Sequence, residues 1–266
     1  MSNLEQRSIS DTHAALRARS PLVQCLTNYV SMDIAANVLN AAGASPAMVH
    51  DAREAGEFAG LASAVVANIG TLSPPWVEGM LAAVGVAHER GTPWVLDPVA
   101  VGATSYRRET VAALLEHDPT VIRGNPSEVL TIATSVAGGR GVDSSAASAE
   151  AVDAARALAA RSGSVVAVTG QEDFVTDGER ALVVRGGHPW MPLITALGCS
   201  ASALVGACCA VQPDPLVASA AALAILAAAG ERAGRDAAGP GSLRWRLLDE
   251  ITLIGPDDLD GRVSPA

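Results

Sequence analysis

The chain has 266 residues, of which 49% are hydrophobic and 17% are charged, and its formal net charge is −10. This length and composition predict a sizeable buried core, while the acidic balance argues against a nucleic acid or an anionic membrane as a partner. Aromatic residues make up only 3% of the chain, so few side chains offer a platform on which a base could stack.

The four cysteines are expected to be reduced thiols in a cytoplasmic protein. They contain no Cys-x-x-Cys pair, so a zinc site is not expected. Residues 1–13 are polar and lack the apolar core of a signal peptide. Residues 199–211 and 216–230 are uncharged, but each run is shorter than the roughly 20 apolar residues of a membrane span. We therefore expect two buried helices there and no membrane partner.

Strands alternate with helices from residue 21 to residue 170. Short apolar runs predict strands over residues 21–26, 47–49, 64–69, 93–96, 121–122 and 165–168. Helices are predicted over residues 4–19, 31–42, 53–61, 74–90, 104–116, 125–134 and 146–161, with a Gly-rich loop over 138–145. Such a βαβ series predicts an α/β fold with a mostly parallel central sheet and helices on both faces.

The pattern changes after residue 170. Asp177-Gly178 predicts a hairpin turn between strands at 173–176 and 181–185. The two Ala-rich helices follow, then a final helix over 242–251 and a polar, mobile tail over 255–266. Because no internal repeat or linker is found, we predict a single domain spanning residues 1–266.

Ligands of such sheets bind outside the carboxyl ends of the strands. The polar or glycine residues that end the predicted strands should therefore share one edge of the sheet. They are Thr27-Asn28, Gly70-Thr71, Asp97, Arg123 and Thr169-Gly170.

The stretch Thr195-Ala196-Leu197-Gly198-Cys199-Ser200 predicts a tight turn followed by a buried helix that begins near Gly198. Free backbone N–H groups at a helix start bind anions. Cys199 would lie in the first turn, where the same field lowers the thiol pKa and favours the thiolate. An anion site beside a base indicates phosphoryl transfer. The alternative is a bend before a core helix with a buried cysteine.

Arg123 at a strand end could bind two phosphate oxygens through its planar guanidinium. Asn125 and Glu128 are three residues apart at a helix start and could hold Mg²⁺ directly or through water. The same pair could equally form a capping box that needs no metal.

Asp97 also suits Mg²⁺, although an Asp-Pro turn would explain it as well. Thr169 with Gly170 could offer a hydroxyl and a close backbone to a phosphate, or could simply end a strand. Neither a GxxxxGK[ST] motif nor a GxGxxG motif occurs. The remaining design for phosphoryl transfer is an anion hole at a helix start, a base beside it, and Mg²⁺ held by acidic residues.

Together these motifs resemble the hydroxyethylthiazole kinase family, which has the ribokinase-like fold. The resemblance covers about residues 20–230. It is carried by Leu26-Thr27-Asn28-Tyr29-Val30, Gly43-Ala44-Ser45-Pro46-Ala47-Met48, Asn68-Ile69-Gly70-Thr71-Leu72-Ser73-Pro74, Leu96-Asp97-Pro98-Val99, Arg123-Gly124-Asn125 with Glu128, Gly141-Val142-Asp143-Ser144, Val168-Thr169-Gly170, and residues 173–178.

The resemblance implies an ATP- and Mg²⁺-dependent kinase for the primary alcohol of 4-methyl-5-(2-hydroxyethyl)thiazole in thiamine biosynthesis or salvage. It also implies a homotrimer with active sites between subunits. By the same resemblance each candidate residue takes a role. Cys199 is the base and Gly198 its backbone partner; Met48, Ala196, Asn28 and Gly70 contact the substrate; Arg123 and Thr169 contact ATP; and Asp97 and Glu128 are the acids of the Mg²⁺ site.

One departure falls in the turn before Cys199. The family pattern is Gly-Thr-Gly-Cys, whereas this chain has Ala196-Leu197-Gly198-Cys199. Alanine tolerates a positive φ far worse than glycine, and leucine removes a hydroxyl and adds bulk where the substrate alcohol would lie. The departure leaves two alternatives open: a related kinase for another small heteroaromatic alcohol, and a thiazole-binding protein with weakened catalysis.

Overall fold

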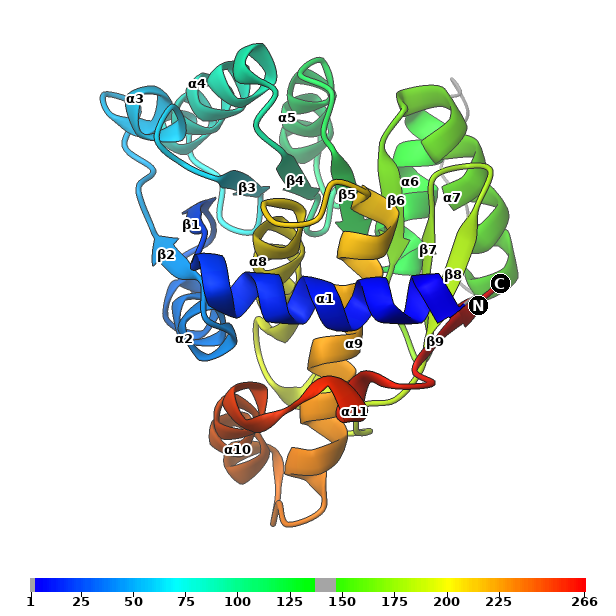
Figure 1. The fold of residues 1–266 in the computed structure, drawn as a ribbon. Helices are drawn as coiled ribbons and strands as arrows, with labels where there is room; N and C mark the ends of the chain where they lie inside the picture. The colour runs from blue at the N-terminus through cyan, green and yellow to red at the C-terminus, as the bar shows by residue number, and fades with distance from the viewer. Residues whose placement is uncertain (1–2, 137–146) are drawn as a thin grey trace.

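The computed structural model describes residues 3–136 and 147–266. The Gly-rich loop expected over 138–145 lies outside these residues. The centre of the molecule is a nine-stranded sheet with the strand order β2-β1-β3-β4-β5-β6-β7-β8-β9 (Figure 1). The strands are β1 (Leu22–Leu26), β2 (Ser45–Ala47), β3 (Ala64–Asn68), β4 (Trp94–Asp97), β5 (Val121–Gly124), β6 (Val165–Val168), β7 (Asp173–Thr176), β8 (Ala181–Val184) and β9 (Val263–Pro265).

Strands β1 to β6 run parallel, and β7, β8 and β9 extend the sheet as an antiparallel meander. The order puts β1 between β2 and β3, so the chain passes outward from β1 to β2 and then returns to β3 on the other side. In such sheets ligands bind at the switch point, here at the carboxyl ends of β1 and β3. The register aligns Asn68 with Asp97 at that edge.

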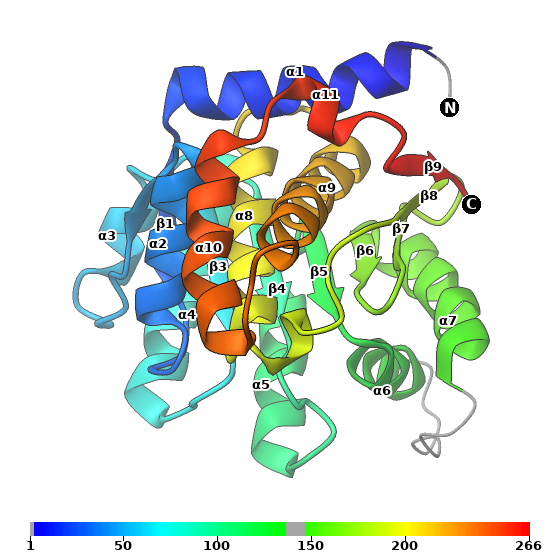
Figure 2. The same ribbon diagram turned by 90° about the horizontal axis from the view of Figure 1, so that it is seen from below.

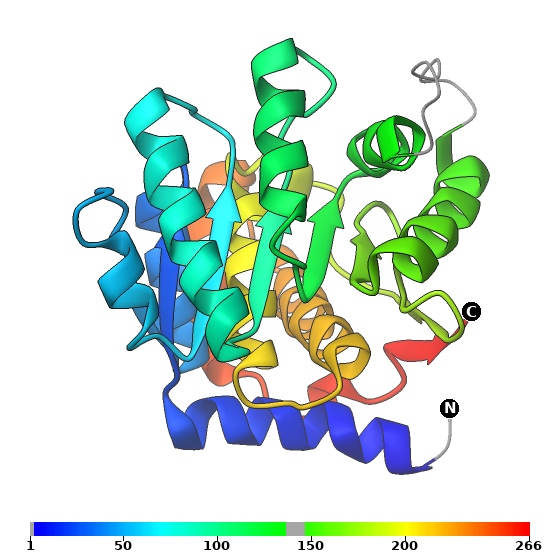
Figure 3. The ribbon, with the colours of Figure 1, turned by 90° about the horizontal axis from the view of Figure 1, so that it is seen from above.

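Helices cover both faces of the sheet (Figures 2 and 3). One face carries α1 (Asn3–Arg19), α2 (Met32–Ala42), α8 (Leu197–Cys209), α9 (Pro215–Gly234) and α10 (Pro240–Leu253). The other carries α3 (Ala55–Ala59), α4 (Pro74–Arg90), α5 (Ser105–Leu115), α6 (Pro126–Val136) and α7 (Ala147–Ser162). The predicted fold class, with a mostly parallel sheet between two layers of helices, is confirmed.

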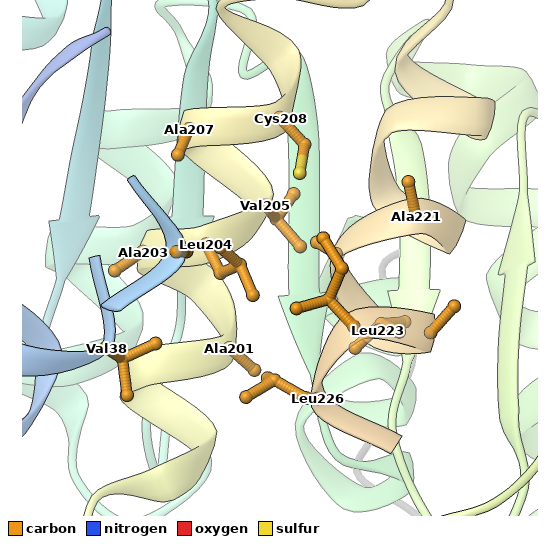
Figure 4. Close-up of a cluster of buried hydrophobic side chains, with 14 of the residues drawn as sticks. Val38, Ala201, Ala203, Leu204, Val205, Ala207, Cys208, Ala221, Leu223 and Leu226 are labelled. Atoms are coloured by element: carbon orange, nitrogen blue, oxygen red, sulfur yellow. The ribbon is translucent and has the colours of Figure 1, made fainter. Parts of the chain in front are cut away.

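The alternation of side chains along the strands divides the core in two. Val66 belongs to the cluster under α8, whereas its neighbours Val65 and Ala67 belong to the cluster under α4. Small residues bring α8 close to the sheet, because a Cβ on Gly206 would lie 2.8 Å from Val66 Cγ2. Figure 4 shows apolar side chains of α8 and α9 meeting beside the sheet, with Val38 of α2 at the edge of the cluster.

Most elements lie near their predicted positions, but four expectations need correction. The second strand is Ser45–Ala47 instead of 47–49, and α3 is shorter than the predicted 53–61. The tail after residue 255 is not mobile and unstructured: it forms α11 (Pro256–Leu259) and β9, which pairs with β8. Buried Val263 and the ion pair of Arg262 with Glu231 attach it to the core.

The fourth correction concerns the second apolar run. The uncharged run 216–230 was judged too short to span a membrane. Helix α9 has 20 residues, however, and by length and composition it could cross one. Its apolar window is 89% buried inside the protein. Helix α9 is therefore a core helix, as predicted for the apolar runs 199–211 and 216–230.

Candidate active site

A chain of buried polar side chains crosses the switch point. Asn28 follows β1, and its Nδ2 donates to Asn68 Oδ1 at the end of β3, at 2.8 Å. Asn68 Nδ2 donates in turn to Asp97 Oδ2 at the end of β4, at 2.7 Å. Ser202 of α8 donates to the same Asp97 oxygen at 2.8 Å. Three strand ends and one helix are thus joined by hydrogen bonds that leave little freedom to the side chains involved.

Asn28 also connects this chain to the first turn of α8. Its Nδ2 lies 3.3 Å from Cys199 Sγ, and its Oδ1 accepts the backbone N–H groups of Val30 and Ser31 at 3.1 and 3.0 Å. Gly70 packs directly against it, because a Cβ on Gly70 would lie 2.5 Å from Asn28 Nδ2. Only glycine leaves room for this contact.

The turn before α8 adopts a conformation that favours glycine. Ala196 has φ 63° and ψ 14°, the left-handed region that L-residues avoid. Its carbonyl accepts both the backbone N–H and the hydroxyl of Ser200, each at 3.0 Å, which closes the first turn of the helix. Leu197 is only 7% exposed and packs into the core beneath α8. The backbone strain that the sequence predicts for an alanine at position 196 is therefore present in the structure.

The Cys199 thiol does not have the lowered pKa that its place in a helix start predicted. Burial raises the pKa of Cys199, and the carboxylate of Asp97 raises it further. The hydrogen bonds from Asn28 and Asn68 and the charge of Arg123 act in the opposite direction but are smaller. Desolvation of the thiolate outweighs the helix field here, so the resting side chain is a thiol at neutral pH.

Arg123 points its guanidinium at the same turn. Its Nη2 donates to Thr169 Oγ1, and its Nη1 lies 4.0 Å from Asp97 Oδ2. A Cβ on Gly198 would lie 2.9 Å from Nη1, so the missing side chain lets the guanidinium approach the helix start. Arg123 is 9% exposed and its Nε has no partner. A guanidinium beside free helix N–H groups is a site for a phosphate.

Asp97 is 1% exposed, and only one of its two carboxylate oxygens accepts hydrogen bonds. Oδ2 is saturated by Asn68 and Ser202, whereas Oδ1 is buried without a partner. Burial raises the pKa of Asp97 to about 6, with Glu128 adding to the rise and Arg123 opposing it. A buried carboxylate oxygen with no donor is suited to a cation.

Glu128 forms the capping box that was the alternative to a metal ligand. Its Oε2 accepts the N–H of Asn125 at 2.8 Å, and its own N–H donates to Asn125 Oδ1 at 2.9 Å. Its Oε1 accepts the N–H of Ala100 at 2.9 Å. Within residues 3–136 and 147–266, no group of three or more His, Cys, Asp or Glu side chains is arranged to hold a metal ion.

Met48 takes no part in the described network around Asn28 and Asp97. It follows β2, on the outer side of β1, and its partly buried side chain packs against the core beneath α2 and α8. Its carbonyl oxygen lies 3.0 Å from His50 Nδ1. The structure therefore brings Asn28, Gly70, Asp97, Arg123, Thr169, Gly198 and Cys199 to one edge of the sheet, with Met48 beside it.

Residues 14–256 match a profile of the hydroxyethylthiazole kinase family. The chain belongs to this family. A hydroxyethylthiazole kinase of Gemmatimonas aurantiaca is 56% identical over 254 residues, which cover 96% of this chain and 91% of that protein.

Solved structures agree with the family assignment. A hydroxyethylthiazole kinase from Pyrococcus horikoshii superposes with a TM-score of 0.91 at 36% identity and covers 98% of this chain and 99% of its own. A pyridoxal kinase of Bacillus subtilis, solved as an ADP complex, superposes with a TM-score of 0.56 at 17% identity and covers 79% of this chain and 91% of its own. At that identity the likeness shows the fold alone, and the expected ribokinase-like fold is confirmed.

Several polar residues of the candidate site were not predicted from the sequence. Asn68 ends a strand whose residues are all buried, which marks it as unusual, and it aligns with Asp97. Ser202 lies three residues after Cys199 and hence on the same side of α8. Asp173 accepts the N–H of Gly170 at 3.0 Å, and burial raises its pKa to about 6.

Arg107 of α5 was also missed, and it joins two loops of the site. Its Nη1 donates to the carbonyls of Ile69 and Val99 at 2.6 and 2.7 Å, and its Nη2 donates to Gly70 at 2.8 Å. No local sequence pattern marks an arginine that binds backbone carbonyls on two other segments. Arg107 gains this role only in the folded chain, where its guanidinium reaches the segments that follow β3 and β4.

Proposed function

We propose that this chain transfers the γ-phosphoryl group of ATP to the hydroxyl of 4-methyl-5-(2-hydroxyethyl)thiazole, a step of thiamine biosynthesis or salvage. The observation that carries the proposal is the Arg123 guanidinium beside the start of α8, next to Cys199 and Asn28. It brings an anion site within one helical turn of polar side chains that suit an alcohol. Membership of the hydroxyethylthiazole kinase family supports the acceptor.

We assign the phosphates of ATP to Arg123, Thr169 and the backbone N–H of Gly198. The unpartnered Nε of Arg123 and the space left by Gly198 support this assignment. The γ-phosphoryl would be positioned between the guanidinium and the helix start, both of which stabilise negative charge. Because these groups are already oriented by hydrogen bonds, little reorganisation is needed when charge develops during transfer.

We assign the acceptor to Met48, Asn28, Gly70 and Ala196. In the transfer step the acceptor oxygen forms the new P–O bond, the bond from the γ-phosphorus to the bridging oxygen of ADP breaks, and the hydroxyl proton passes to the Cys199 thiolate. The Asn28 hydrogen bond to Sγ supports the thiolate. Since the pKa of the thiol is raised, this assignment requires catalysis to favour alkaline pH.

Mg²⁺ would supply charge neutralisation for the ATP phosphates. The unpartnered Oδ1 of Asp97 fits such an ion. Glu128 would act through a water, because both of its carboxylate oxygens already accept backbone N–H groups. The electrostatic coupling of Asp97 to Glu128 supports their sharing one site.

We further propose that the protein is a cytoplasmic homotrimer with active sites between subunits. The side chains that follow Asn28 support an interface: Tyr29 is 69% exposed and Val30 is 59% exposed. Exposed apolar groups beside a site are typical of a contact surface. All four cysteines are free thiols, which suits a reducing compartment.

The Ala196-Leu197 departure favours one second candidate, a kinase for another small heteroaromatic alcohol. A strained Ala196 next to the acceptor implies that the local chain has been altered where the family has glycine and threonine. The same donor assignments would hold for that reaction. Only the acceptor pocket would differ.

A titration with the thiazole alcohol beside a turnover assay tests the proposal. The purified chain, ATP, Mg²⁺ and the alcohol should yield ADP and the thiazole phosphate ester in equal amounts, measured by mass spectrometry. Binding of the alcohol without ester formation would contradict the kinase assignment. Ester formation only with another alcohol, such as a hydroxymethylpyridine, would replace the acceptor and support the second candidate.

A further inference from the structure

We propose that His50, Trp76 and Gly79 form a positioning unit that fixes segment 48–51 against α4 and thereby sets the affinity for the acceptor alcohol. The inference rests on the proposed function, in which Met48 borders the acceptor. His50, Trp76 and Gly79 do not touch the reacting atoms in this scheme. They act through the backbone of the segment that carries Met48.

The imidazole of His50 is held on two sides. Its Nδ1 lies 3.0 Å from the carbonyl oxygen of Met48, so that the ring N–H donates to this carbonyl. Its face stacks on the indole of Trp76, with ring centroids 3.9 Å apart and planes inclined by 20°. Trp76 is itself 4% exposed on α4. The ring therefore joins the Met48 backbone to a fixed helix.

Gly79 lies one turn further along α4 and allows the segment to come close. A Cβ at this position would lie 2.2 Å from the carbonyl oxygen of His50, a separation that real side chains do not reach. Gly85, two turns along the same helix, gives a contrast: its nearest neighbour would be His117 Cε1 at 3.7 Å, an ordinary contact. The close approach is thus specific to Gly79.

A third anchor comes from the sheet. Gln24 of β1 is fully buried, and its Nε2 donates to the carbonyl of Val49 and to that of Ala55, each at 3.0 Å. The carbonyls of Met48, Val49 and His50 are therefore each engaged by a different group: the imidazole, the Gln24 amide, and the close packing on Gly79. Three consecutive constraints leave this backbone one conformation.

The stack also reaches the other side of the acceptor site. The ring of Tyr29 meets Trp76 edge to face, with centroids 4.8 Å apart, and Tyr29 directly follows Asn28. One of the two tyrosines and one of the four tryptophans thus gather here, in a chain that is only 3% aromatic. The stack links the segments of Met48 and Asn28, both assigned to the acceptor, whereas Arg123 lies on β5 and Thr169 directly follows β6.

Five variants of the full-length protein test the inference. His50→Phe keeps a ring on Trp76 but removes the donor to Met48, and His50→Asn keeps a donor near Nδ1 but removes the ring. Gly79→Ala forces the segment away from α4. The matched controls are His88→Phe and Gly85→Ala, which place the same changes further along α4, where His88 is exposed and away from the segment of Met48.

We expect His50→Phe to raise the KM for the thiazole alcohol roughly three- to tenfold, the effect of one lost hydrogen bond. The KM for ATP and the kcat at saturating alcohol should stay within about twofold, because uniform acceptor binding is what is lost. His50→Asn should recover part of the acceptor KM. Gly79→Ala should raise it at least as much as His50→Phe, and both controls should leave it unchanged.

Three results would overturn the inference: an unchanged acceptor KM in both His50→Phe and Gly79→Ala, equal rises in the KM for alcohol and for ATP, or equal effects of Gly79→Ala and Gly85→Ala. Thermal melting of each variant identifies any that fails to fold, and His50→Asn at its half-buried position then carries the comparison. A wild-type protein that makes no thiazole ester refutes the proposed function instead, so the two failures are distinguishable.

Discussion

Asn28 Nδ2 lies 3.3 Å from Cys199 Sγ, although the two residues are 171 positions apart in the chain. This contact joins the end of β1 to the first turn of α8 and places an N–H donor against the sulfur. The donor favours the thiolate, but burial and the Asp97 carboxylate favour the thiol more strongly. The protonation state of Cys199 is therefore the point at which the proposed chemistry can be tested by pH.

The activity of the wild-type protein should keep rising with pH above neutrality. A base must be deprotonated to accept a proton, and the pKa of Cys199 is raised above its ordinary value, so kcat/KM should increase through the alkaline range without a neutral plateau. Cys199→Asp should flatten this rise, because a carboxylate ionises at lower pH. Cys199→Ser should lose roughly 10²–10⁴-fold in rate, the usual contribution of a general base.

Alkylation provides an independent measurement of the same thiol. The other three cysteines are buried, so a neutral alkylating reagent should modify Cys199 first. Its rate should rise with pH over the same range as kcat/KM. If kcat/KM no longer rises with pH above pH 7 while the alkylation of Cys199 at pH 7 is still slow, Cys199 is not the proton acceptor.

Arg123→Ala should raise the KM for ATP roughly 10- to 100-fold, because charge-assisted hydrogen bonds to phosphate are lost. The KM for the thiazole alcohol should change little. Gly198→Ala should act in the same direction, since its methyl group would lie 2.9 Å from Nη1 and displace the guanidinium. Arg108→Ala, an exposed arginine of α5, is the control. Equal losses for both substrates would contradict the assignment of Arg123 to the phosphates.

Ala196→Gly should stabilise the protein by about 0.5–1 kcal/mol. Relief of the left-handed strain at φ 63° is offset in part by the greater chain entropy of glycine. For a chain of this size the melting temperature should rise by about 2 °C. Ala203→Gly, at a helical and buried position of α8, should instead destabilise by about 1 kcal/mol or more. A fall in melting temperature for Ala196→Gly would contradict the strain.

The strand ends were the most predictable part of the site. Asp97, Arg123 and Thr169 each follow a short apolar run, and a parallel sheet brings such ends to one edge. The partner of a polar residue was not predictable, because it depends on the register between strands: Asn68 is opposite Asp97 only in the assembled sheet. The Cys199 pKa was predicted in the wrong direction, since the helix position is visible in the sequence and burial is not.

The fold shows the same division between local and tertiary information. The predicted ends of two helices, at residues 42 and 90, are those of α2 and α4, and each is followed by a glycine in the left-handed conformation, Gly43 and Gly91. The tail was predicted wrongly because its composition is polar and its few apolar residues, such as Val263 and Leu259, are buried only against distant elements. A strand of three residues has no periodicity of its own to reveal it.

The contribution of His13 to the stability of the protein should be lost as the pH is lowered from about 6.5 to about 4. Burial, with Arg17 beside it, lowers the pKa of His13 to about 4, and its Nε2 accepts a hydrogen bond from Arg17 Nε at 3.1 Å. The unfolded chain binds a proton at higher pH than the folded one, so protonation favours unfolding in this window. The contribution should be about 2–3 kcal/mol.

His13→Gln keeps an acceptor for Arg17 but does not titrate. Urea unfolding at pH 7 and at pH 4 gives the free energy of unfolding of each protein at each pH. The change in this free energy on going from pH 7 to pH 4 should be more destabilising for the wild type than for His13→Gln. Because all other titrating groups are shared, the comparison isolates His13. An identical pH dependence in the two proteins would show that His13 is not held neutral by the fold.

A structure of the protein with the thiazole alcohol and a non-hydrolysable ATP analogue bound is the most direct test of the account. The account predicts the γ-phosphate between Arg123 and the start of α8, and the alcohol oxygen within hydrogen-bond reach of Cys199 Sγ and beside Asn28. The ring of the alcohol should contact the Met48 segment. A nucleotide whose phosphates do not contact Arg123, or an alcohol bound away from the switch point between β1 and β3, would contradict it.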